Sequence, residues 1–351
     1  MYIIKTYARG KEITLNTVLI TGVAGFMGSH LADVFLAKGY KVKGIDNFIG
    51  GYSSNVPKGI DFFEADLDDY NRIESQFVGV DLVIHAACTA YEGLSVFSPS
   101  LISRNTFQIT ANVISASIKH KVKKFVFLSS MARYGTQDQI PFVESMQPKP
   151  QDPYGIAKVA AEMLLKNMSE THGMKYVIVV PHNIIGPRQK YDDPFRNVAS
   201  IMINRMLQGN QPVIYGDGNQ KRCFSFMNDV TSPIVRACES DSVNGMIINI
   251  GPDEEYVSIN ELASRIAKII GFDLDPIYLP GRPQEVLNAN CSADVARQFL
   301  SYATTTSLDE GLVELIEWIR KSKPKKFDYH LPIEFVTEKT PISWTTDLFN
   351  E

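Results

Sequence analysis

The chain contains 351 residues, and its 35 Lys and Arg against 39 Asp and Glu give a formal net charge of −4 at pH 7. This balance argues against a protein that coats nucleic acid, because neutralising phosphates requires a surplus of basic side chains. Charged residues make up 21% and hydrophobic residues 44% of the chain, so we expect a folded globular protein. Its length corresponds to about two domains.

The cysteine content and the apolar runs indicate the cellular compartment in which the protein is expected. The four cysteines form no CxxC pair, so neither a disulfide framework nor a metal site is predicted. No apolar run reaches the length of a membrane span. The first residues, MYIIKTYARGKEITLN, lack the basic segment and apolar stretch of a secretion signal. We therefore expect a cytoplasmic protein that does not associate with membranes.

The first half of the chain alternates short apolar runs with amphipathic stretches. The apolar runs predict strands at residues 17–21, 41–45, 60–64, 81–86, 124–129 and 175–180. Helical spacing of apolar residues predicts helices at 29–38, 104–120 and 153–170. Strands of continuous Val, Ile, Leu and Phe are buried on both faces, as in a parallel sheet covered by helices. The predicted fold class is therefore α/β, with a Rossmann-like doubly wound parallel sheet.

After residue 181 the segments become shorter and are separated by Gly- and Pro-containing turns. Helices are expected at residues 198–207, 259–270 and 308–319. We predict a nucleotide-binding domain over residues 17–181, to which later segments return a strand and a helix. A smaller mixed α/β lobe over residues 182–320 and a C-terminal extension over residues 321–351 complete the predicted organisation.

A glycine-rich segment, TGVAGFMG, follows the first predicted strand and opens the first helix. Glycines at this spacing allow a tight turn, close approach of a diphosphate and close packing of helix on strand. The helix N-terminus would then face the phosphates with its N–H groups. A plain strand-to-helix turn is the alternative interpretation. The residues expected to contact a dinucleotide here are Gly22, Gly25, Phe26, Met27 and Gly28.

An acidic residue follows at the position that a dinucleotide site requires. Asp46 ends the second predicted strand, 18 residues after Gly28, where a carboxylate can accept hydrogen bonds from the adenosine ribose. It would repel a 2′-phosphate, so the predicted cofactor is NAD rather than NADP. A turn residue at a strand end is the alternative. Further residues expected along the cofactor follow the second, third and fourth strands: Asn47, Asp66, Leu67, Ala86 and Ala87.

Tyr154 and Lys158 lie four residues apart just inside a predicted helix, and so share one helix face. An ammonium close to a phenol lowers the pKa of the phenol, which allows the tyrosine to act as a general base near neutral pH. A YxxxK pattern alone is common by chance. Here it follows a dinucleotide fingerprint and the pair Ser129 and Ser130, so the combination predicts a catalytic tyrosine.

Taken together, the motifs resemble the extended short-chain dehydrogenase/reductase family, in its NAD-dependent sugar-nucleotide epimerase/dehydratase branch. The likeness runs from residue 17 to about residue 320, and the segments that carry it are TGVAGFMGSH, FVFLSSMARYG, DPYGIAK, HNIIGPR, GDGNQKRCFSFMNDV and GRPQEV. The resemblance implies that Ser130 is the catalytic hydroxyl, with Ser129 as the neighbouring alternative. It also implies that Tyr154 is the base and acid, and that Lys158 binds the nicotinamide ribose.

The resemblance also implies a substrate site. Asn183, Arg222 and Arg282 would contact the diphosphate of a nucleotide sugar, and Ser130 would contact the sugar. A UDP-hexose or UDP-N-acetylhexosamine is the favoured substrate. Surface solvation is the alternative for the two arginines. The two helices predicted at residues 104–120 and 153–170 resemble the pair that forms homodimers in this family, so a homodimer is expected.

The absence of acidic residues directly after Ser130 restricts which reaction of this family the chain can catalyse. The related 4,6-dehydratases place acidic residues directly after the catalytic hydroxyl, whereas Met131 and Ala132 stand there in this chain and cannot transfer protons. We therefore predict a 4-epimerase, which oxidises C4 of the sugar and returns the hydride to the other face. A 4-dehydrogenase or 4-ketoreductase is the alternative. A non-enzymatic dinucleotide-binding regulator is disfavoured by the intact Ser130, Tyr154 and Lys158.

Three features stay open. Glu92 either contacts substrate or solvates a loop. Some epimerases have a bulky aromatic residue that closes the sugar pocket, but Asn, Ala and Asn occupy residues 288–290 here, which favours a wider pocket. The C-terminal extension has no functional interpretation.

Overall fold

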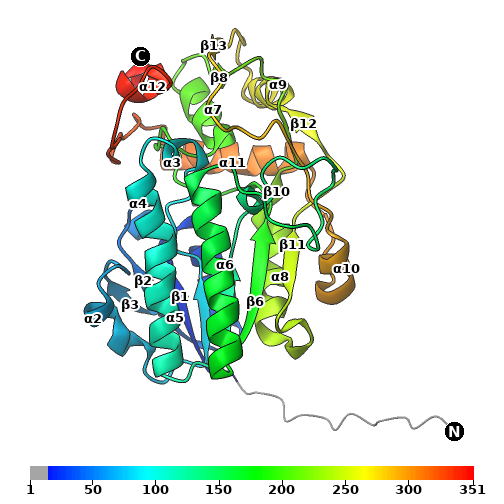
Figure 1. Ribbon diagram of the computed structural model, residues 1–351. Coiled ribbons are helices and arrows are strands. Elements are labelled where there is room, and N and C mark those ends of the chain that lie inside the picture. Colours follow the sequence, from blue (N-terminus) through cyan, green and yellow to red (C-terminus); the bar gives the residue numbers. More distant parts are fainter. Residues whose placement is uncertain (1–14) are drawn as a thin grey trace, which may run out of the picture.

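The computed structural model describes residues 15–351. The expectation about a secretion signal therefore lies almost wholly outside the described residues. A sheet flanked by helices forms the larger lobe, and a smaller lobe lies over one end of its strands (Figure 1). Within residues 15–351 no helix is long and apolar enough to cross a lipid bilayer.

The larger lobe contains a seven-stranded, wholly parallel sheet in the order β3-β2-β1-β4-β5-β6-β11. Its strands are β1 (Thr17–Thr21), β2 (Lys41–Asp46), β3 (Asp61–Glu64), β4 (Leu82–His85), β5 (Lys124–Leu128), β6 (Lys175–Pro181) and β11 (Ile247–Ile250). The chain builds outward from β1 to β3 and then crosses to β4. A crevice therefore opens beyond the carboxyl ends of β1 and β4, where ligands bind in open α/β sheets. The predicted doubly wound α/β fold is confirmed.

Helices cover both faces of this sheet. One apolar core lies between the sheet and α1 (Phe26–Ala37), α8 (Met227–Glu239) and α10 (Asp294–Leu300). The other lies beneath α2 (Tyr70–Ile73), α5 (Ile109–Lys119) and α6 (Pro153–His172). Because β11, α8 and α10 come after residue 181, the two lobes interleave along the chain.

Two helices start earlier than the sequence predicts. α1 begins at Phe26 rather than at residue 29, because Gly25 adopts an extended conformation at its N-cap and the helix starts inside the glycine-rich segment. The predicted helix at 104–120 starts earlier, with α4 (Pro99–Ser103), and passes through a π-helical turn (Arg104–Gln108) before α5. Such turns in a helix often mark functional sites, and this one places Asn105 beside the crevice described below.

The smaller lobe packs α7 (Val198–Leu207), α9 (Ile259–Ile270) and α11 (Leu308–Ser322) around a third apolar core. Its short strands form the pairs β7 (Ile184–Ile185) with β10 (Ser225–Phe226) and β8 (Val213–Tyr215) with β13 (Ile277–Leu279). A third small sheet joins β12 (Val257–Ser258), β9 (Lys221–Arg222) and β14 (Asn288–Ala289). These strands bring segments far apart in the sequence over the crevice.

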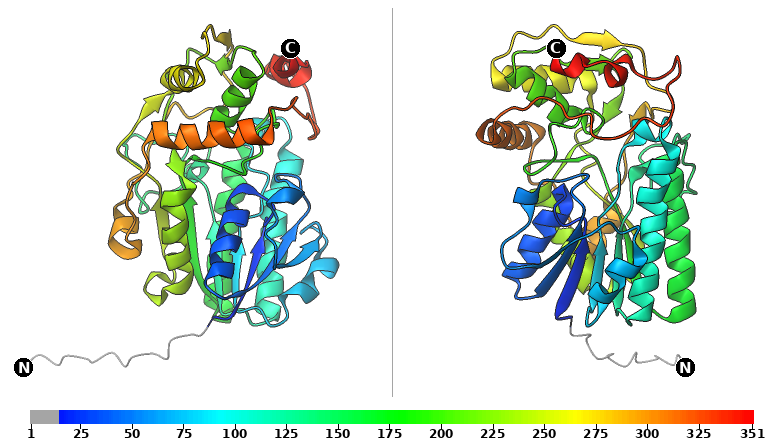
Figure 2. Two further views of the ribbon diagram at one scale, coloured as in Figure 1. Left: turned by 180° about the vertical axis from the view of Figure 1, so that it is seen from behind. Right: turned by 90° about the vertical axis from the view of Figure 1, so that its left-hand side faces the viewer.

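The C-terminal extension is ordered around two short helical segments. After α11 the chain turns back past α3 (Glu92–Ser95) and ends in α12 (Ile342–Thr345) and a 3₁₀ turn (Leu348–Asn350). Figure 2 shows this segment in red, leaving α11 and crossing to the side of the molecule that holds α4. Phe327, Trp344 and Phe349 are buried, so the extension belongs to the folded core rather than to the surface. Further 3₁₀ turns lie at Ser53–Asn55, Glu74–Phe77, Met131–Arg133 and Asp241–Val243.

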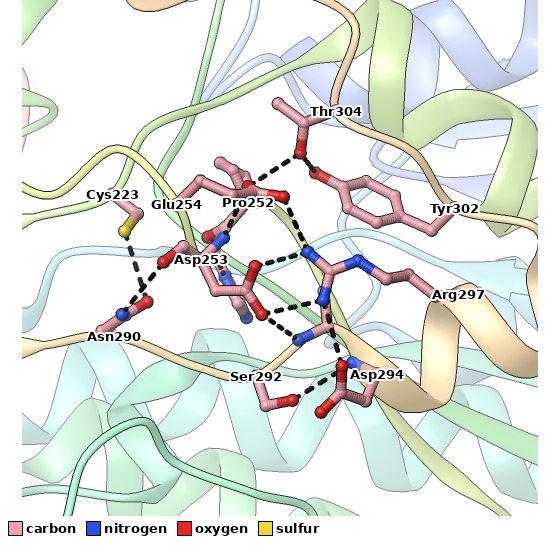
Figure 3. Close-up of polar contacts among 12 residues, drawn as sticks. Cys223, Pro252, Asp253, Glu254, Asn290, Ser292, Asp294, Arg297, Tyr302 and Thr304 are labelled. Atoms are coloured by element: carbon pink, nitrogen blue, oxygen red, sulfur yellow. Dashed lines mark hydrogen bonds and ion pairs between the residues drawn. The ribbon is translucent and has the colours of Figure 1, made fainter.

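An ion-pair network joins α10 to the loop that follows β11 (Figure 3). The Arg297 guanidinium pairs with Asp253, with Glu254 at 2.8 Å and with Asp294 at 3.2 Å. None of these four side chains lines the crevice. The network therefore fixes α10 to this loop, away from the crevice.

Candidate active site

A deep pocket of about 410 Å³ lies over the carboxyl ends of the central strands, between the two lobes. Every residue predicted from sequence to contact cofactor or substrate lines it. These residues come from segments between Gly22 and Arg282, so the fold brings together what the sequence separates. The pocket is the candidate active site.

The glycine-rich segment is shaped by contacts that no side chain could share. Gly22 has a φ of 72°, and a Cβ there would lie 2.8 Å from the Cα of Ala87. A Cβ on Gly28 would lie 2.1 Å from the carbonyl oxygen of Gly22. The N-cap of α1 is Gly25, which has no side chain to cap the helix, so the N–H groups of its first turn are left for a ligand. This geometry fits a diphosphate at the helix N-terminus.

Asp46 is fixed at the end of β2 by the backbone around it. Its carboxylate accepts hydrogen bonds from the N–H of Ala24 at 2.8 Å and of Phe48 at 2.7 Å. Burial raises its pKa, and these N–H donors oppose that rise. Next to it, the Asn47 amide donates to Asp66 at 3.2 Å. The result is a pre-set polar edge that fits the adenosine end of NAD.

Asn105 gives a further indication of a bound group. It lies on the π-helical turn, is buried and lines the pocket. Its side-chain Nδ2 has no hydrogen-bond partner among the described residues. Because an unpaired buried donor is costly, the site fits a ligand that supplies an acceptor. Together with the glycine cradle and Asp46, it makes the pocket compatible with NAD.

His85, by contrast, serves packing. Its Nδ1 pairs with the Thr21 hydroxyl at 2.7 Å and its Nε2 with the Thr110 hydroxyl at 2.9 Å. Complete burial lowers its pKa to about 3, so it stays neutral. This placement agrees with a structural role for the strand-end histidine.

Tyr154 stands at the base of the pocket in the first turn of α6. Asp152 caps this helix by accepting from the N–H of Gly155 at 2.9 Å, and Pro153 opens it. The Tyr154 hydroxyl lies 3.9 Å from Sγ of Cys88. The cap therefore fixes the phenol at the point where the two lobes meet.

The expected effect of Lys158 on Tyr154 is not found. The Lys158 ammonium donates to the carbonyl of Leu128 at 2.7 Å and lies 5.8 Å from the centre of the Tyr154 ring. Burial raises the pKa of Tyr154 well above its usual value, Cys88 and Glu92 raise it further, and Ser130 lowers it. The lowered pKa expected for Tyr154 is not found, because the Lys158 ammonium is directed at a carbonyl and burial disfavours the phenolate.

The structure separates the two candidate serines. Ser129 donates to the buried carboxylate of Glu162, which also pairs with Arg133 at 3.0 Å. Ser130 is half-buried, lines the pocket and contributes to the pKa of Tyr154. Ser130 is therefore placed for chemistry, whereas the Ser129 hydroxyl is engaged in a buried ion-pair network.

The predicted diphosphate residues converge on the opposite wall. Asn183 donates to the carbonyl of Cys223 at 3.0 Å. Arg222 is held by backbone carbonyls, including Leu287 at 3.0 Å. Arg282 pairs with Glu285 at 2.9 Å, and its guanidinium lies 4.9 Å from the centre of the Tyr215 ring. Two oriented guanidinium groups on one wall suit a diphosphate.

Glu92, left open by the sequence, lies in this pocket rather than on an outer loop. It is the first residue of α3, and its side chain lines the cavity between Tyr154 and the two arginines. The side chain is open to the pocket, but desolvation by the surrounding pocket walls, together with Asp152, raises its pKa to about 7, although Arg222 and Arg282 lower it. Glu92 thus faces the substrate region.

Sequence reasoning missed several pocket residues. Arg196 lines the pocket with its guanidinium 5.7 Å from the centre of the Tyr91 ring, and it forms no ion pair with any described residue. Tyr215 and Phe349 also line it. Tyr215 ends the short strand β8 and Phe349 lies in a 3₁₀ turn, and none of the three residues belongs to a recognisable motif, so only the tertiary structure identifies them. In the described range, no three His, Cys, Asp or Glu side chains are grouped to hold a metal.

The fold and the pocket define a dinucleotide-dependent enzyme. Comparison with known proteins shows the family to which it belongs. The family model of the NAD dependent epimerase/dehydratase family matches residues 18–251. The chain belongs to this family, and its cofactor is NAD. The resemblance inferred from sequence is thus confirmed.

Curated relatives and solved structures agree with this assignment. A UDP-N-acetyl-alpha-D-glucosaminuronate decarboxylase of Bacillus cytotoxicus is 33% identical over 86% of this chain and 97% of its own. A UDP-glucose 4-epimerase of Mycolicibacterium smegmatis is 30% identical over 86% of this chain and 98% of its own. The crystal structure of UDP-glucose 4-epimerase from Thermotoga maritima, with UDP-glucose, has a TM-score of 0.82 and 32% identity over 87% of this chain and 99% of that one.

Proposed function

We propose that this protein is an NAD-dependent UDP-sugar 4-epimerase, with a UDP-hexose or UDP-N-acetylhexosamine as substrate. The observation that carries the proposal is the position of Tyr154, between the NAD cradle around Gly22 and the diphosphate wall of Arg222 and Arg282. A sugar whose diphosphate lies on that wall extends toward Tyr154. The names of the relatives support the same substrate class.

The proposed mechanism assigns a role to each side chain. Arg222, Arg282 and Asn183 hold the diphosphate, and this anchor lets the sugar turn while it stays bound. Tyr154 removes the proton of the C4 hydroxyl and later returns it, while the Ser130 hydroxyl orients that oxygen. NAD, when bound, would supply the redox chemistry at C4 of the sugar, first oxidising the alcohol to the ketone and then, in its reduced form, reducing the ketone back to the alcohol. Lys158 holds the nicotinamide ribose near Tyr154.

The surroundings of Tyr154 favour its protonated form. Burial is the main reason that its pKa is raised, and the nearby Glu92 and Cys88 add to it. Because the pKa of Glu92 is about 7, this carboxyl is largely protonated in mildly acidic solution and then adds little to the rise. Ligands that bring positive charge to the base of the pocket would favour the phenolate.

Competing reactions are distinguished by the residues beside Ser130. Met131 and Ala132 occupy the 3₁₀ turn that follows it, and neither can donate a proton. This argues against a 4,6-dehydratase. It argues equally against a decarboxylase, the activity in the name of the Bacillus cytotoxicus relative. A 4-dehydrogenase or 4-ketoreductase uses the same residues and is the second candidate.

The test is turnover without added cofactor. The purified protein is incubated with UDP-, GDP-, dTDP- and CDP-sugars, and the anomeric and H4 signals are followed by proton NMR. Conversion of a UDP-sugar to its C4 epimer is the expected result. Accumulation of NADH with a 4-keto product would establish the dehydrogenase instead, and an unchanged panel would refute both.

We also propose a cytoplasmic homodimer. The outer face of α6 exposes Ile156 at 54% and Met163 at 69%, next to α5, which suits a four-helix interface between two copies. The four cysteines are unpaired thiols, as expected in a reducing compartment. Light scattering should give twice the chain mass, and Met163→Glu should give the monomer.

A further inference from the structure

The C-terminal extension lies beyond the segments that carry the family motifs. The Thermotoga maritima structure is covered over 99% of its length but matches only 87% of this chain. The likeness read from the sequence stops near residue 320, and residues 321–351 follow it. Yet this extension contributes Phe349 to the lining of the pocket. Its contacts therefore bear on substrate binding.

The extension is fastened to both lobes. On the larger lobe, the Glu334 carboxylate accepts hydrogen bonds from the N–H groups of Ser100 at 3.0 Å and Leu101 at 2.7 Å, at the start of α4. On the smaller lobe, Arg205 donates to the carbonyl of Leu348 at 2.7 Å. Asn350 also pairs with the backbone of Phe327, at 2.6 and 3.1 Å, which closes the extension into a loop. Its position is thus determined at several points.

Aromatic side chains of this loop pack into the wall of the pocket. Trp344 is buried and packs edge-on against Phe195, with ring centres 5.5 Å apart. The Trp344 ring also packs against Gly93, the residue that follows Glu92: a Cβ on Gly93 would lie 3.0 Å from this ring. Phe349 is 1% exposed and packs against Phe327. Aromatic residues from the extension thus fill part of the wall of the pocket.

One contact links the extension to a proposed diphosphate residue. The Ser343 hydroxyl lies 2.5 Å from the hydroxyl of Tyr215, and Ser343 is itself fully buried. The Tyr215 ring in turn lies beneath the Arg282 guanidinium. Because a planar guanidinium binds a diphosphate only when its orientation is set, a fixed Tyr215 orients Arg282 for its ligand.

We propose that the C-terminal extension completes the nucleoside diphosphate subsite, with Ser343 as a positioning residue that acts through Tyr215 on Arg282, and Phe349 as part of the subsite wall. The proposal rests on the proposed function for the identity of the ligand. It assigns the extension to the UDP part of the substrate rather than to the sugar or to NAD.

The test measures binding rather than turnover. Dissociation constants of UDP and of UDP-glucose are determined by calorimetry on the NAD-loaded protein. Ser343→Ala should weaken both ligands by the same factor, on the order of fivefold, because one oriented contact is lost. Phe349→Ala should weaken both by about tenfold or more. The NAD content should stay unchanged.

Matched variants isolate the effect. Thr345→Ala removes a hydroxyl in the same short helix that bonds only to the carbonyl of Ile342, and Phe335→Ala removes an exposed ring of the same segment. Both should bind UDP as the wild type does. Tyr215→Phe removes the other half of the hydroxyl pair, so the double variant with Ser343→Ala should cost no more than either single variant.

Several results would overturn the inference. Unchanged UDP affinity in Ser343→Ala and Phe349→Ala would do so, as would a loss confined to UDP-glucose, which would assign the extension to the sugar. A parallel loss of NAD would assign it a general structural role. Additive losses in the double variant would disprove the link through Tyr215. If the wild type binds UDP but epimerises no UDP-sugar, the proposed function is wrong, and the binding data still decide this inference.

Discussion

The two ends of the pocket are built in different ways. At the cofactor end, Gly22, Gly28 and Asp46 stand within one strand–helix–strand unit, and their positions follow from backbone contacts. At the substrate end, Arg222, Arg282 and Phe349 come from three separate segments and are placed by side-chain and tertiary contacts. The cofactor end is therefore formed by residues close together in the sequence, whereas the substrate end depends on contacts between distant segments of the chain.

This difference predicts how substitutions at each end of the pocket affect ligand binding. A backbone cradle tolerates no added atom, so a single methyl group at Gly28 should disable it. A wall of oriented side chains should lose affinity in steps as each member is changed. Substitutions can therefore break one end while the other still binds its ligand, and Tyr154, where the ends meet, should matter to turnover alone.

Tyr154→Phe should have the largest effect. Removing the proposed general base at C4 should lower kcat by about 10²- to 10⁴-fold, with NAD and UDP binding retained. Turnover is followed by NMR and bound NAD by absorbance after denaturation. Tyr278→Phe, at an exposed tyrosine of the smaller lobe, serves as the control and should be fully active. Activity of Tyr154→Phe within tenfold of the wild type would exclude the proposed base.

Gly28→Ala should abolish NAD retention. The new Cβ would lie 2.1 Å from the Gly22 carbonyl oxygen, so the loop must move out of the shape that receives the diphosphate. Overpacking of this kind costs about 1–3 kcal/mol of stability, and UDP should still bind. In the control Gly281→Ala, the nearest atom to the new Cβ is 3.9 Å away, and NAD should be retained. Full NAD content in Gly28→Ala would contradict the local cradle.

Arg282→Lys should weaken UDP by roughly tenfold while NAD stays bound. Lysine keeps the charge but loses the planar fork and the stacking on Tyr215. Calorimetry with UDP measures the change. Arg320→Lys, which alters an exposed arginine of α11, provides the control. An unchanged UDP affinity would remove Arg282 from the diphosphate wall.

Glu92→Gln should have the smallest effect, visible as a change in pH dependence. The pKa of Glu92 is about 7, so raising the pH from 6 to 8 adds a negative charge close to Arg222 and Arg282. Affinity for UDP-glucose should therefore fall about threefold over this range in the wild type. It should be nearly constant in Glu92→Gln. Glu317→Gln on α11 is the matched control. If Glu92→Gln shows the same pH dependence of UDP-glucose affinity as the wild type, Glu92 is not the group whose ionisation changes the affinity.

The sequence by itself determined the sheet, the glycine cradle and the placement of Tyr154 and Lys158 on the same helix. These features depend on hydrophobic period, turn chemistry and helix spacing, which act over a few residues. It also placed Asp46, because a strand end after the fingerprint fixes its distance from the cradle.

Only the tertiary structure decided the rest, because burial and direction depend on contacts between distant segments. It directed the Lys158 ammonium at the Leu128 carbonyl, and so reversed the expected change in the pKa of Tyr154. It gave Ser129 a partner in Glu162 and left Ser130 without that bond, which favours Ser130 as the catalytic hydroxyl. It also brought the C-terminal extension, which has no motif, into the wall of the pocket, since the packing of Trp344 and Phe349 depends on residues more than a hundred positions away.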